Sequence, residues 1–305
     1  MIRKHNRRAA KAAFAIALGV AIVLGGAAAA PAAHTTTAAT PIILGTKDFP
    51  EQFILGQLYK QALEAKGFKV TYKENIGGTE LIDKSLTSGK VTMYPEYTGI
   101  ALAVTFKRST LPRTALGTYN LAKQLYGRRG QTMTKQTLFQ DKDAIAVLRA
   151  TATKYGLKTV GDLKKVPGLT LAGFPPFKAR WAPELKARYG VSGFAFTPLA
   201  GISAYTLLDQ KKVLAAAIFT TDPALISTRY VVLSDPKNMF GFQYVAPVLS
   251  KKLVTENGAA FTSTLNKVSG LLTLRAMIAM NKAVSVVKKS AAVVASAFLK
   301  ANGLK

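Results

Sequence analysis

Short apolar stretches alternate along the first part of the chain with longer amphipathic ones. The apolar stretches are too short for helices and favour buried strands, whereas the amphipathic ones repeat apolar side chains at helical spacing. Gly67 is predicted to end the first helix, and Thr79 is the predicted N-cap of the second. Such alternation is typical of βαβ units in a mainly parallel sheet. The pattern predicts strands at residues 42–45, 68–72 and 91–93, and helices at residues 51–66 and 79–89.

A second series of alternating strands and helices begins after Asp141. The carboxyl-terminal stretch that follows it carries an apolar stripe and is predicted to be helical. Two α/β units in tandem predict a two-lobed protein, and ligands of open α/β sheets bind at the carboxyl ends of the strands. A ligand cleft is therefore expected between the lobes. The predicted strands lie at residues 144–148, 169–173, 194–197, 213–219, 231–233 and 244–249, and the predicted helices at residues 160–164, 181–189 and 202–210.

Residues 1–33 have the layout of a secretory signal. A basic beginning is followed by the uncharged apolar run Ala12–Ala30 and by small residues up to Ala33, after which residues 34–41 form a linker. An uncleaved membrane anchor is the alternative, but a run rich in Ala and Gly rather than Leu favours cleavage. The chain has no cysteine, so it lacks both disulfides and the residue that would carry a lipid anchor. We therefore expect a soluble periplasmic protein whose signal peptide is removed.

The chain is strongly basic, with 42 Lys and Arg against 15 Asp and Glu and a formal net charge of +27. Such a charge could serve an anionic polymer or a membrane surface, and both remain alternative partners. The basic residues, however, are dispersed as single residues and short pairs such as Lys164–Lys165, without an arginine-rich helix. This dispersal favours a generally basic surface, and no nucleic-acid partner is expected.

The residue types on which most catalysis depends are scarce. The two histidines, His5 and His34, lie in the predicted signal and linker, so the predicted core has no histidine to act as a base or a metal ligand. The chain contains neither a G-x-S-x-G elbow nor a P-loop, and Gly77–Gly78–Thr79 alone is a weak nucleotide signal. We therefore expect a binding protein without cofactor or metal. An exported enzyme on the same two-lobed scaffold remains an alternative, because a fold does not fix a function.

Six short motifs occur in a particular order. They are TKDFPEQ at 46–52, GGTE at 77–80, YPEYTG at 94–99, TTD at 220–222, APV at 246–248 and FLKxxGL at 298–304. From residue 42 to its end, the chain thereby resembles the glycine betaine/choline/osmoprotectant substrate-binding proteins of ABC transporters. The resemblance implies a type II periplasmic-binding-protein fold with two crossovers, a monomer that closes on a small solute and delivers it to an ABC permease in the inner membrane. Lobe I would comprise residues 42–141 and 245–305, and lobe II residues 142–244.

The resemblance also implies a site for a small zwitterion. A quaternary ammonium group has no N–H to donate, so aromatic faces hold it best, whereas the carboxylate of a betaine needs basic or hydroxyl donors. Tyr97 matches a cage tyrosine of the resembled family, and Lys47 and Arg180 match its basic residues. Phe219 stands where many members have Tyr. The weaker candidates for the cleft are Asp141, Thr79 and Glu80.

At other positions the chain departs from the family pattern. Ile100 replaces a threonine, and Asp143 replaces an aromatic ring. A usual cage tyrosine aligns with Gln243, although a shift of one residue would restore Tyr244. A carboxylate suits an ammonium group with N–H bonds better than a methylated one. Glycine betaine or choline is the ligand that the resemblance implies, and our alternative hypothesis is an amino acid or a less methylated amine.

Overall fold

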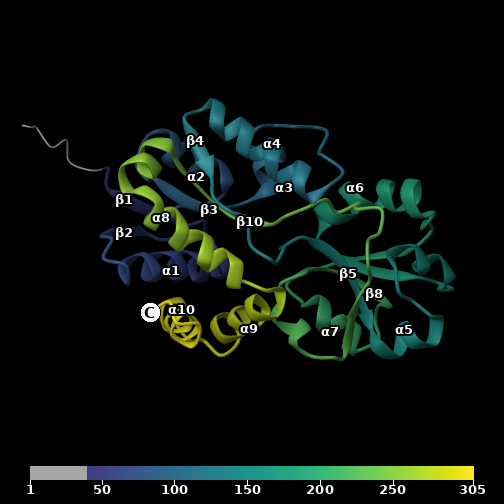
Figure 1. Cartoon of the computed structure of the whole chain (residues 1–305). Helices are drawn as coiled ribbons and strands as arrows, with labels where there is room; N and C mark the ends of the chain where they lie inside the picture. Colours follow the sequence, from purple (N-terminus) through teal and green to yellow (C-terminus); the bar gives the residue numbers. More distant parts are fainter. Residues whose placement is uncertain (1–39) are drawn as a thin grey trace, which may run out of the picture. The chain divides into compact units, whose positions relative to one another are not determined.

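The computed structural model describes residues 40–305, so the predicted signal peptide and most of the predicted linker lie outside the described residues. Two five-stranded sheets organise this part of the chain (Figure 1). Within residues 40–305, every helix is too short or too polar to traverse a bilayer.

The first sheet takes its strands from two separate parts of the sequence. Its order is β2-β1-β3-β10-β4. Strand β1 pairs in parallel with β2 and β3, whereas β10 lies antiparallel between β3 and β4. The bounds are Ile42–Gly45 for β1, Val70–Lys73 for β2, Met93–Tyr97 for β3, Gln131–Met133 for β4 and Val245–Ser250 for β10.

The second sheet is built from the intervening part of the chain. Its order is β7-β6-β8-β5-β9. Strand β6 pairs in parallel with β7 and β8, whereas β5 lies antiparallel between β8 and β9. The bounds are Asp143–Leu148 for β5, Thr170–Gly173 for β6, Ala195–Pro198 for β7, Ala215–Phe219 for β8 and Tyr230–Val232 for β9. The exact bounds predicted for the two lobes stay a prediction.

The expectation of mainly parallel sheets is wrong. Each sheet contains one strand, β10 or β5, that runs antiparallel to both of its neighbours. These are the strands that the chain forms directly after it passes from one sheet to the other. A strand that follows a βαβ crossover in its own sheet returns parallel, but a strand that arrives from elsewhere has no such constraint.

Helices cover both sheets. Those beside the first sheet are α1 (Pro50–Glu64), α2 (Thr79–Thr87), α3 (Thr98–Ile100), α4 (Ala115–Arg128), α8 (Lys251–Leu271), α9 (Leu274–Ser285) and α10 (Ala291–Ala301). Those beside the second are α5 (Arg149–Tyr155), α6 (Pro175–Glu184) and α7 (Ala204–Asp209). The shorter turns are π-helical at Ala101–Thr105 and Leu185–Tyr189, and 3₁₀ at Val160–Lys165 and Pro223–Ile226.

The largest apolar core lies between the first sheet and its helices. Helix α1 packs against α8, α9 and α10, so the carboxyl-terminal helices complete a lobe that begins at β1 (Figure 1). Leu44, Tyr59, Phe261 and Leu299 are fully buried there. Burial of one such side chain contributes about 1.5–3 kcal/mol.

Several predicted boundaries are corrected by the structure. Gly78, not Thr79, is the N-cap of α2, and Thr79 is its first helical residue. Pro175 and Pro176 form the first turn of α6, where a proline loses no helical hydrogen bond. Helix α6 therefore begins earlier than the predicted helix. The pattern also missed α4, β4 and α5.

Strand β3 extends through the aromatic motif at residues 94–97, which we expected to follow the strand. Proline is rare in a central strand because it donates no hydrogen bond. Here Pro95 lies directly opposite Pro247 of β10. The two missing N–H groups thus fall at the same position of the ladder. Strand β3 can therefore continue through Glu96 and Tyr97, which form its carboxyl end.

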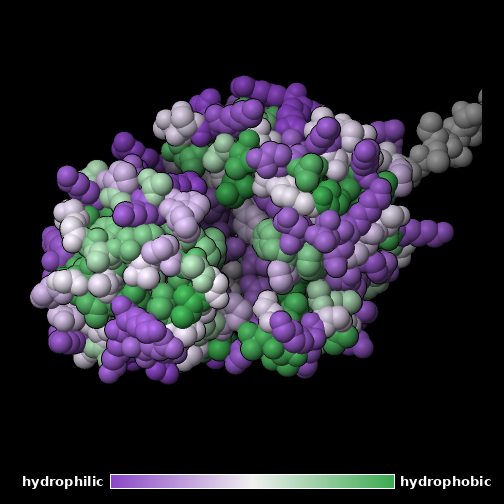
Figure 2. All heavy atoms as spheres, turned by 180° about the vertical axis from the view of Figure 1, so that it is seen from behind, coloured by the Kyte–Doolittle hydropathy of each residue, from purple (hydrophilic) through white to green (hydrophobic). Residues whose placement is uncertain are grey.

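The surface agrees with the dispersed charge of the sequence. Figure 2 shows hydrophilic residues over much of the face seen from behind, with hydrophobic ones interspersed. Several ion pairs at the surface are local, such as Lys60–Glu64 within α1 and Arg188–Glu184 at the end of α6, whereas Arg229–Asp209 joins more distant residues.

Candidate ligand-binding cleft

Two adjoining cavities lie where elements of the two sheets meet. We call the first, of about 250 Å³, the mixed-charge cavity, because its lining includes Lys47, Arg180 and Asp143. We call the second, of about 400 Å³, the acidic cavity, because Glu51 and Asp222 line it. The two share three lining residues, Phe49, Asp141 and Phe219, so they are compartments of one cleft.

The structure brings most of the predicted site residues together. Those that line the mixed-charge cavity are Lys47, Thr79, Tyr97, Asp141, Asp143, Arg180, Phe219 and Gln243. Glu80 is exposed on α2 and lines neither cavity. Tyr244 also lines neither cavity and forms an isolated bridge with Gln140, so Gln243 is the residue of this pair that lies at the cleft.

Tyr97 ends β3 and is 4% exposed. Its hydroxyl donates to Glu51 Oε1 at 2.9 Å, and the ring of Phe49 stacks on it with 6.1 Å between centroids. The Nζ atom of Lys47 lies 5.0 Å from the centroid of the same ring. These contacts fix the ring at the cavity wall. Its role as a cage residue stays a prediction.

Lys47 lies two residues beyond the carboxyl end of β1 and is 3% exposed. Its Nζ atom lies 2.5 Å from Oε1 of Glu96, which is fully buried in β3. Burial raises the pKa of Glu96, and the charge of Lys47 opposes that increase. The ammonium group of Lys47 thus already has a carboxylate partner, and a ligand carboxylate would have to share it.

Arg180, Trp181 and Asp143 form a cluster at the opposite wall. The guanidinium carbon of Arg180 lies 4.5 Å from the centroid of the Trp181 ring, and Trp181 Nε1 donates to Asp143 Oδ2 at 2.9 Å. Burial raises the pKa of Asp143, whereas the hydrogen bond from Trp181 and the charge of Arg180 oppose the increase. The carboxylate at position 143 is therefore tied to an indole ring, which the sequence pattern did not indicate.

Aromatic surface is more abundant here than the sequence predicted. Besides Tyr97 and Phe219, the rings of Phe49, Trp181 and Phe240 line the mixed-charge cavity. Trp181 and Phe240 meet edge to face at 5.1 Å between centroids. The signal available in the sequence was weak: Trp181 is the one tryptophan of the chain and follows Arg180, and Phe49 lies inside the TKDFPEQ motif. Lys142, between the two aspartates, is a further lining residue that we missed.

Gln243 braces the wall that contains Ile100. Its Oε1 atom accepts from the backbone N–H of Ile100 at 2.9 Å. Gly99 packs closely against the same segment. A Cβ atom added at Gly99 would be 2.6 Å from the carbonyl oxygen of Phe242 and 2.7 Å from Gln243 Nε2. Gly99 therefore lets the end of β3 approach the segment that leads into β10.

We expect Gly99→Ala to lower the free energy of unfolding by about 1–3 kcal/mol, because the backbone at Phe242 must move to admit the methyl group. Urea unfolding measures the change. Gly270→Ala is a matched control, since Gly270 is exposed in α8 with open space around it, and alanine there should be neutral or stabilising. An equal effect of both substitutions would contradict the proposed close contact.

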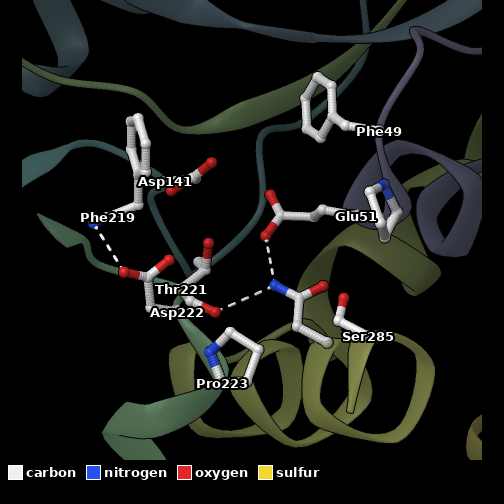
Figure 3. Close-up of a pocket in the computed structure, with 10 residues that line it drawn as sticks. Phe49, Glu51, Asp141, Phe219, Thr221, Asp222, Pro223 and Ser285 are labelled. Carbon is white, nitrogen blue, oxygen red and sulfur yellow. Dashed lines mark hydrogen bonds between the residues drawn. The ribbon is translucent and has the colours of Figure 1, made fainter. Parts of the chain in front are cut away.

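The acidic cavity is organised around Glu51, which lies 4% exposed in the first turn of α1 (Figure 3). Besides the Tyr97 hydroxyl, Glu51 accepts from Asn281 Nδ2 of α9 at 2.7 Å. Asn281 Nδ2 also donates to the carbonyl oxygen of Thr221 at 3.0 Å. The asparagine thus links helices of the first lobe to the segment after β8. Neither Glu51 nor Asn281 was among the predicted site residues, although Glu51 lies in a quoted motif.

Asp141 and Asp222 complete the acidic lining. Asp222 Oδ2 accepts from the Tyr205 hydroxyl at 3.0 Å and from the backbone N–H of Phe219 at 3.1 Å. Figure 3 shows the carboxyl groups of Glu51 and Asp141 both reaching into the space between them. Burial raises the pKa of all three carboxyls, and for Asp141 the repulsion from Glu51 adds to the increase.

An α/β fold of two sheets, with a cleft lined by five aromatic rings and by charges of both signs, defines a binding protein for small charged solutes. The comparisons identify the family. Residues 40–301 match the substrate binding domain of ABC-type glycine betaine transport systems, and the chain belongs to this family. It is therefore the solute-binding component of an ABC transporter, as the resemblance implied.

Relatives support the assignment over nearly the whole described chain. A glycine-betaine-binding protein of Pseudomonas aeruginosa is 29% identical over 278 residues, covering 86% of this chain and 88% of that protein. An ergothioneine transport permease/ergothioneine binding protein, EgtU of Helicobacter pylori, is 28% identical; the match covers 87% of this chain and 48% of that protein.

Solved structures confirm the predicted two-lobed fold. The apo form of YehZ from Escherichia coli superposes with a TM-score of 0.77 at 26% identity, covering 88% of this chain and all of that one. A glycine betaine/carnitine/choline ABC transporter structure superposes with a TM-score of 0.81 at 23% identity, covering 86% of this chain and 99% of that one. At 23% identity, this second structure shows a shared fold and nothing about the ligand.

Proposed function

We propose that this chain binds a small quaternary-amine solute, such as a betaine, in the mixed-charge cavity and presents it to an ABC permease. The observation that carries the proposal is the concentration of five rings, Phe49, Tyr97, Trp181, Phe219 and Phe240, around one cavity. A methylated ammonium group binds best to several aromatic faces, because it has no N–H to donate. The names of the relatives, which include a glycine-betaine-binding protein, point the same way.

Arg180 is the group that we assign to the carboxylate of such a ligand. It lines the cavity from α6 with its guanidinium held over Trp181. Lys47 would add a second positive charge, although Glu96 already neutralises much of it. The protein would work outside the cytoplasm after removal of the predicted signal peptide, as a monomer that closes around its ligand by a hinge motion.

The alternative ligand, an amino acid or less methylated amine, was suggested by Asp143 and Gln243. In the structure Asp143 Oδ2 accepts from Trp181, and Gln243 Oε1 accepts from the backbone of Ile100. Both polar groups thus already have protein partners, and the rings beside them offer the larger surface. We therefore favour a quaternary amine over an amine with N–H bonds at this position.

Isothermal titration with glycine betaine, choline and free amino acids tests the proposal. We expect at least one quaternary amine to bind about tenfold or more tightly than any free amino acid, a difference that corresponds to about 1.4 kcal/mol. Tighter binding of an amino acid would instead support the alternative ligand. A cavity site should also keep its affinity when salt is added, whereas a polyanion-binding surface would lose it.

Mass spectrometry of each candidate ligand after incubation with the protein separates binding from catalysis. A ligand that is recovered unchanged is the expected result, and its conversion would support the exported-enzyme alternative. Native mass spectrometry of freshly purified protein would in addition reveal a small molecule that the cleft retains.

A further inference from the structure

The acidic cavity is an exception in a very basic chain. The formal net charge is +27, yet Glu51, Asp141 and Asp222 line this cavity, and in the part of the chain that the structure describes no Lys or Arg lines it. Buried carboxylates normally have basic partners, because an uncompensated charge in a protein interior is costly. The cavity therefore gathers three carboxyl groups to which none of its lining residues supplies a positive charge.

Unpaired acceptor atoms in the same cavity are a second, independent observation. Asn281 is 6% exposed, and both hydrogen bonds found for its side chain use Nδ2 as the donor. Its Oδ1 atom and Oδ1 of Asp141 are buried without a hydrogen-bond partner among residues 40–305. An unsatisfied buried acceptor is unfavourable, because it has lost its hydrogen bonds to water without gaining a partner in the protein, so such atoms mark places where a donor is missing.

The acidic cavity is also placed where a ligand could extend into it. It shares Phe49, Asp141 and Phe219 with the mixed-charge cavity. Phe219 is 40% exposed although it is a large apolar side chain. A ligand with its quaternary group among the rings could therefore continue past Phe49 and Phe219 toward Glu51 and Asp222.

We propose that the acidic cavity is a second subsite, which binds a protonated N–H group of a ligand whose quaternary ammonium group occupies the mixed-charge cavity. The proposal rests on the proposed function and makes it more specific. The N–H donors would meet carboxylate oxygens of Asp141 and Asp222 and the unpaired Oδ1 of Asn281. The preferred ligand is then longer than glycine betaine and carries a second, hydrogen-bonding cationic group.

Binding at this subsite should be coupled to protons. Burial raises the pKa values of the carboxyls of Glu51, Asp141 and Asp222, and Asp143, Tyr97 and Tyr205 are the other titratable groups that face them. A bound cation favours the ionised carboxylates and lowers their pKa values. Binding of the cation should therefore release protons from these carboxyls. The affinity for the cation should rise as the pH rises through the range in which the carboxyls titrate.

A matched pair of probes tests the subsite on the intact protein. The first is (4-aminobutyl)trimethylammonium, and the second is pentyltrimethylammonium, which has the same length and quaternary group but a methyl group in place of the amine. We expect the amine to bind about 10- to 100-fold more tightly, the effect of hydrogen bonds to charged groups. Calorimetry in buffers of different ionisation enthalpy should show more proton release for the amine than for the alkyl probe.

Substitution locates the effect. Asp222→Asn keeps the shape of the side chain and removes its charge, and it should reduce the ratio of the two affinities toward one; Glu51→Gln provides a second variant should the first fold poorly. Equal affinities of the two probes for the unaltered protein would overturn the subsite while leaving the proposed function intact. Binding of neither probe, nor of glycine betaine or choline, would overturn the proposed function and the subsite with it.

Discussion

Replacing Lys47 with methionine is expected to lower the free energy of unfolding by about 3–5 kcal/mol, the range for removal of one partner from a buried ion pair. Lys47 is 3% exposed and Glu96 fully buried, so solvent cannot replace the lost ammonium group. The carboxylate of Glu96 would keep its hydrogen bonds from the Tyr97 backbone and the Tyr94 hydroxyl but lose its only basic partner among the ion pairs of residues 40–305.

The dependence on pH gives this prediction a second signature. The pKa of Glu96 is already raised by burial, and without Lys47 it should rise further. A raised carboxyl pKa contributes stability that is fully present below the unfolded value of 4.5 and is lost as the pH rises through the folded value. The deficit of Lys47→Met should therefore be small in acid and grow toward neutral pH.

Urea unfolding of the ligand-free protein at several pH values measures both effects. The double variant Lys47→Met/Glu96→Gln removes the uncompensated charge and should recover much of the loss. Lys60→Met breaks the exposed pair with Glu64 and should cost less than about 1 kcal/mol. A loss for Lys47→Met as small as that for Lys60→Met would show that the buried pair contributes little.

The alternation of apolar and amphipathic stretches predicted the class of fold because it reflects local geometry. Strand β1 and helix α1 were predicted within a few residues, since a short apolar run and a helical stripe can each be recognised within one segment. The position of Lys47 just beyond the end of β1 could be predicted for the same reason, because polar residues shortly after a buried strand lie at the edge of the sheet.

Properties that depend on distant segments could not be predicted in this way. The antiparallel direction of β5 and β10 depends on where the chain enters each sheet, which no local pattern records. The pairing of Lys47 with Glu96 requires β1 and β3 to be neighbours, and the choice of Gln243 over Tyr244 depends on how the chain approaches β10. The rings of Phe49, Trp181 and Phe240 likewise converge from separate elements.

The same limit explains why the sequence overstated the polarity of the site. In the sequence, Asp143 stands where the resembled family has an aromatic ring. In the structure, Trp181 of α6 donates a hydrogen bond to Asp143, and the ring of Trp181 lines the cavity. A substitution at one wall can therefore be compensated by a residue from another element. The aromatic character that a quaternary ammonium group requires is a property of the assembled cavity and not of one motif.

Arg180→Ala is expected to weaken binding of glycine betaine by about 2–5 kcal/mol, the range for truncating one partner of a buried charge pair. Arg180 is exposed in this structure, so this range applies to the pair once the cleft has closed over the ligand. Arg180 lines the mixed-charge cavity, and its guanidinium is oriented by contact with the Trp181 ring, so it is preorganised for the two oxygens of a carboxylate. Choline has no carboxylate, and its affinity should change by less than about tenfold, or 1.4 kcal/mol. Titration of both ligands against the same variant measures the difference.

Two control variants separate the possible causes of a loss. Lys178→Ala removes one positive charge from the same helix, yet Lys178 lines neither cavity of the cleft, so it should leave both affinities almost unchanged. Arg180→Lys keeps the charge but loses the planar fork, and it should recover only part of the betaine affinity. An equal loss of betaine and choline binding in Arg180→Ala would mean that Arg180 acts by holding Trp181 in place, because only a direct contact with the carboxylate distinguishes the two ligands.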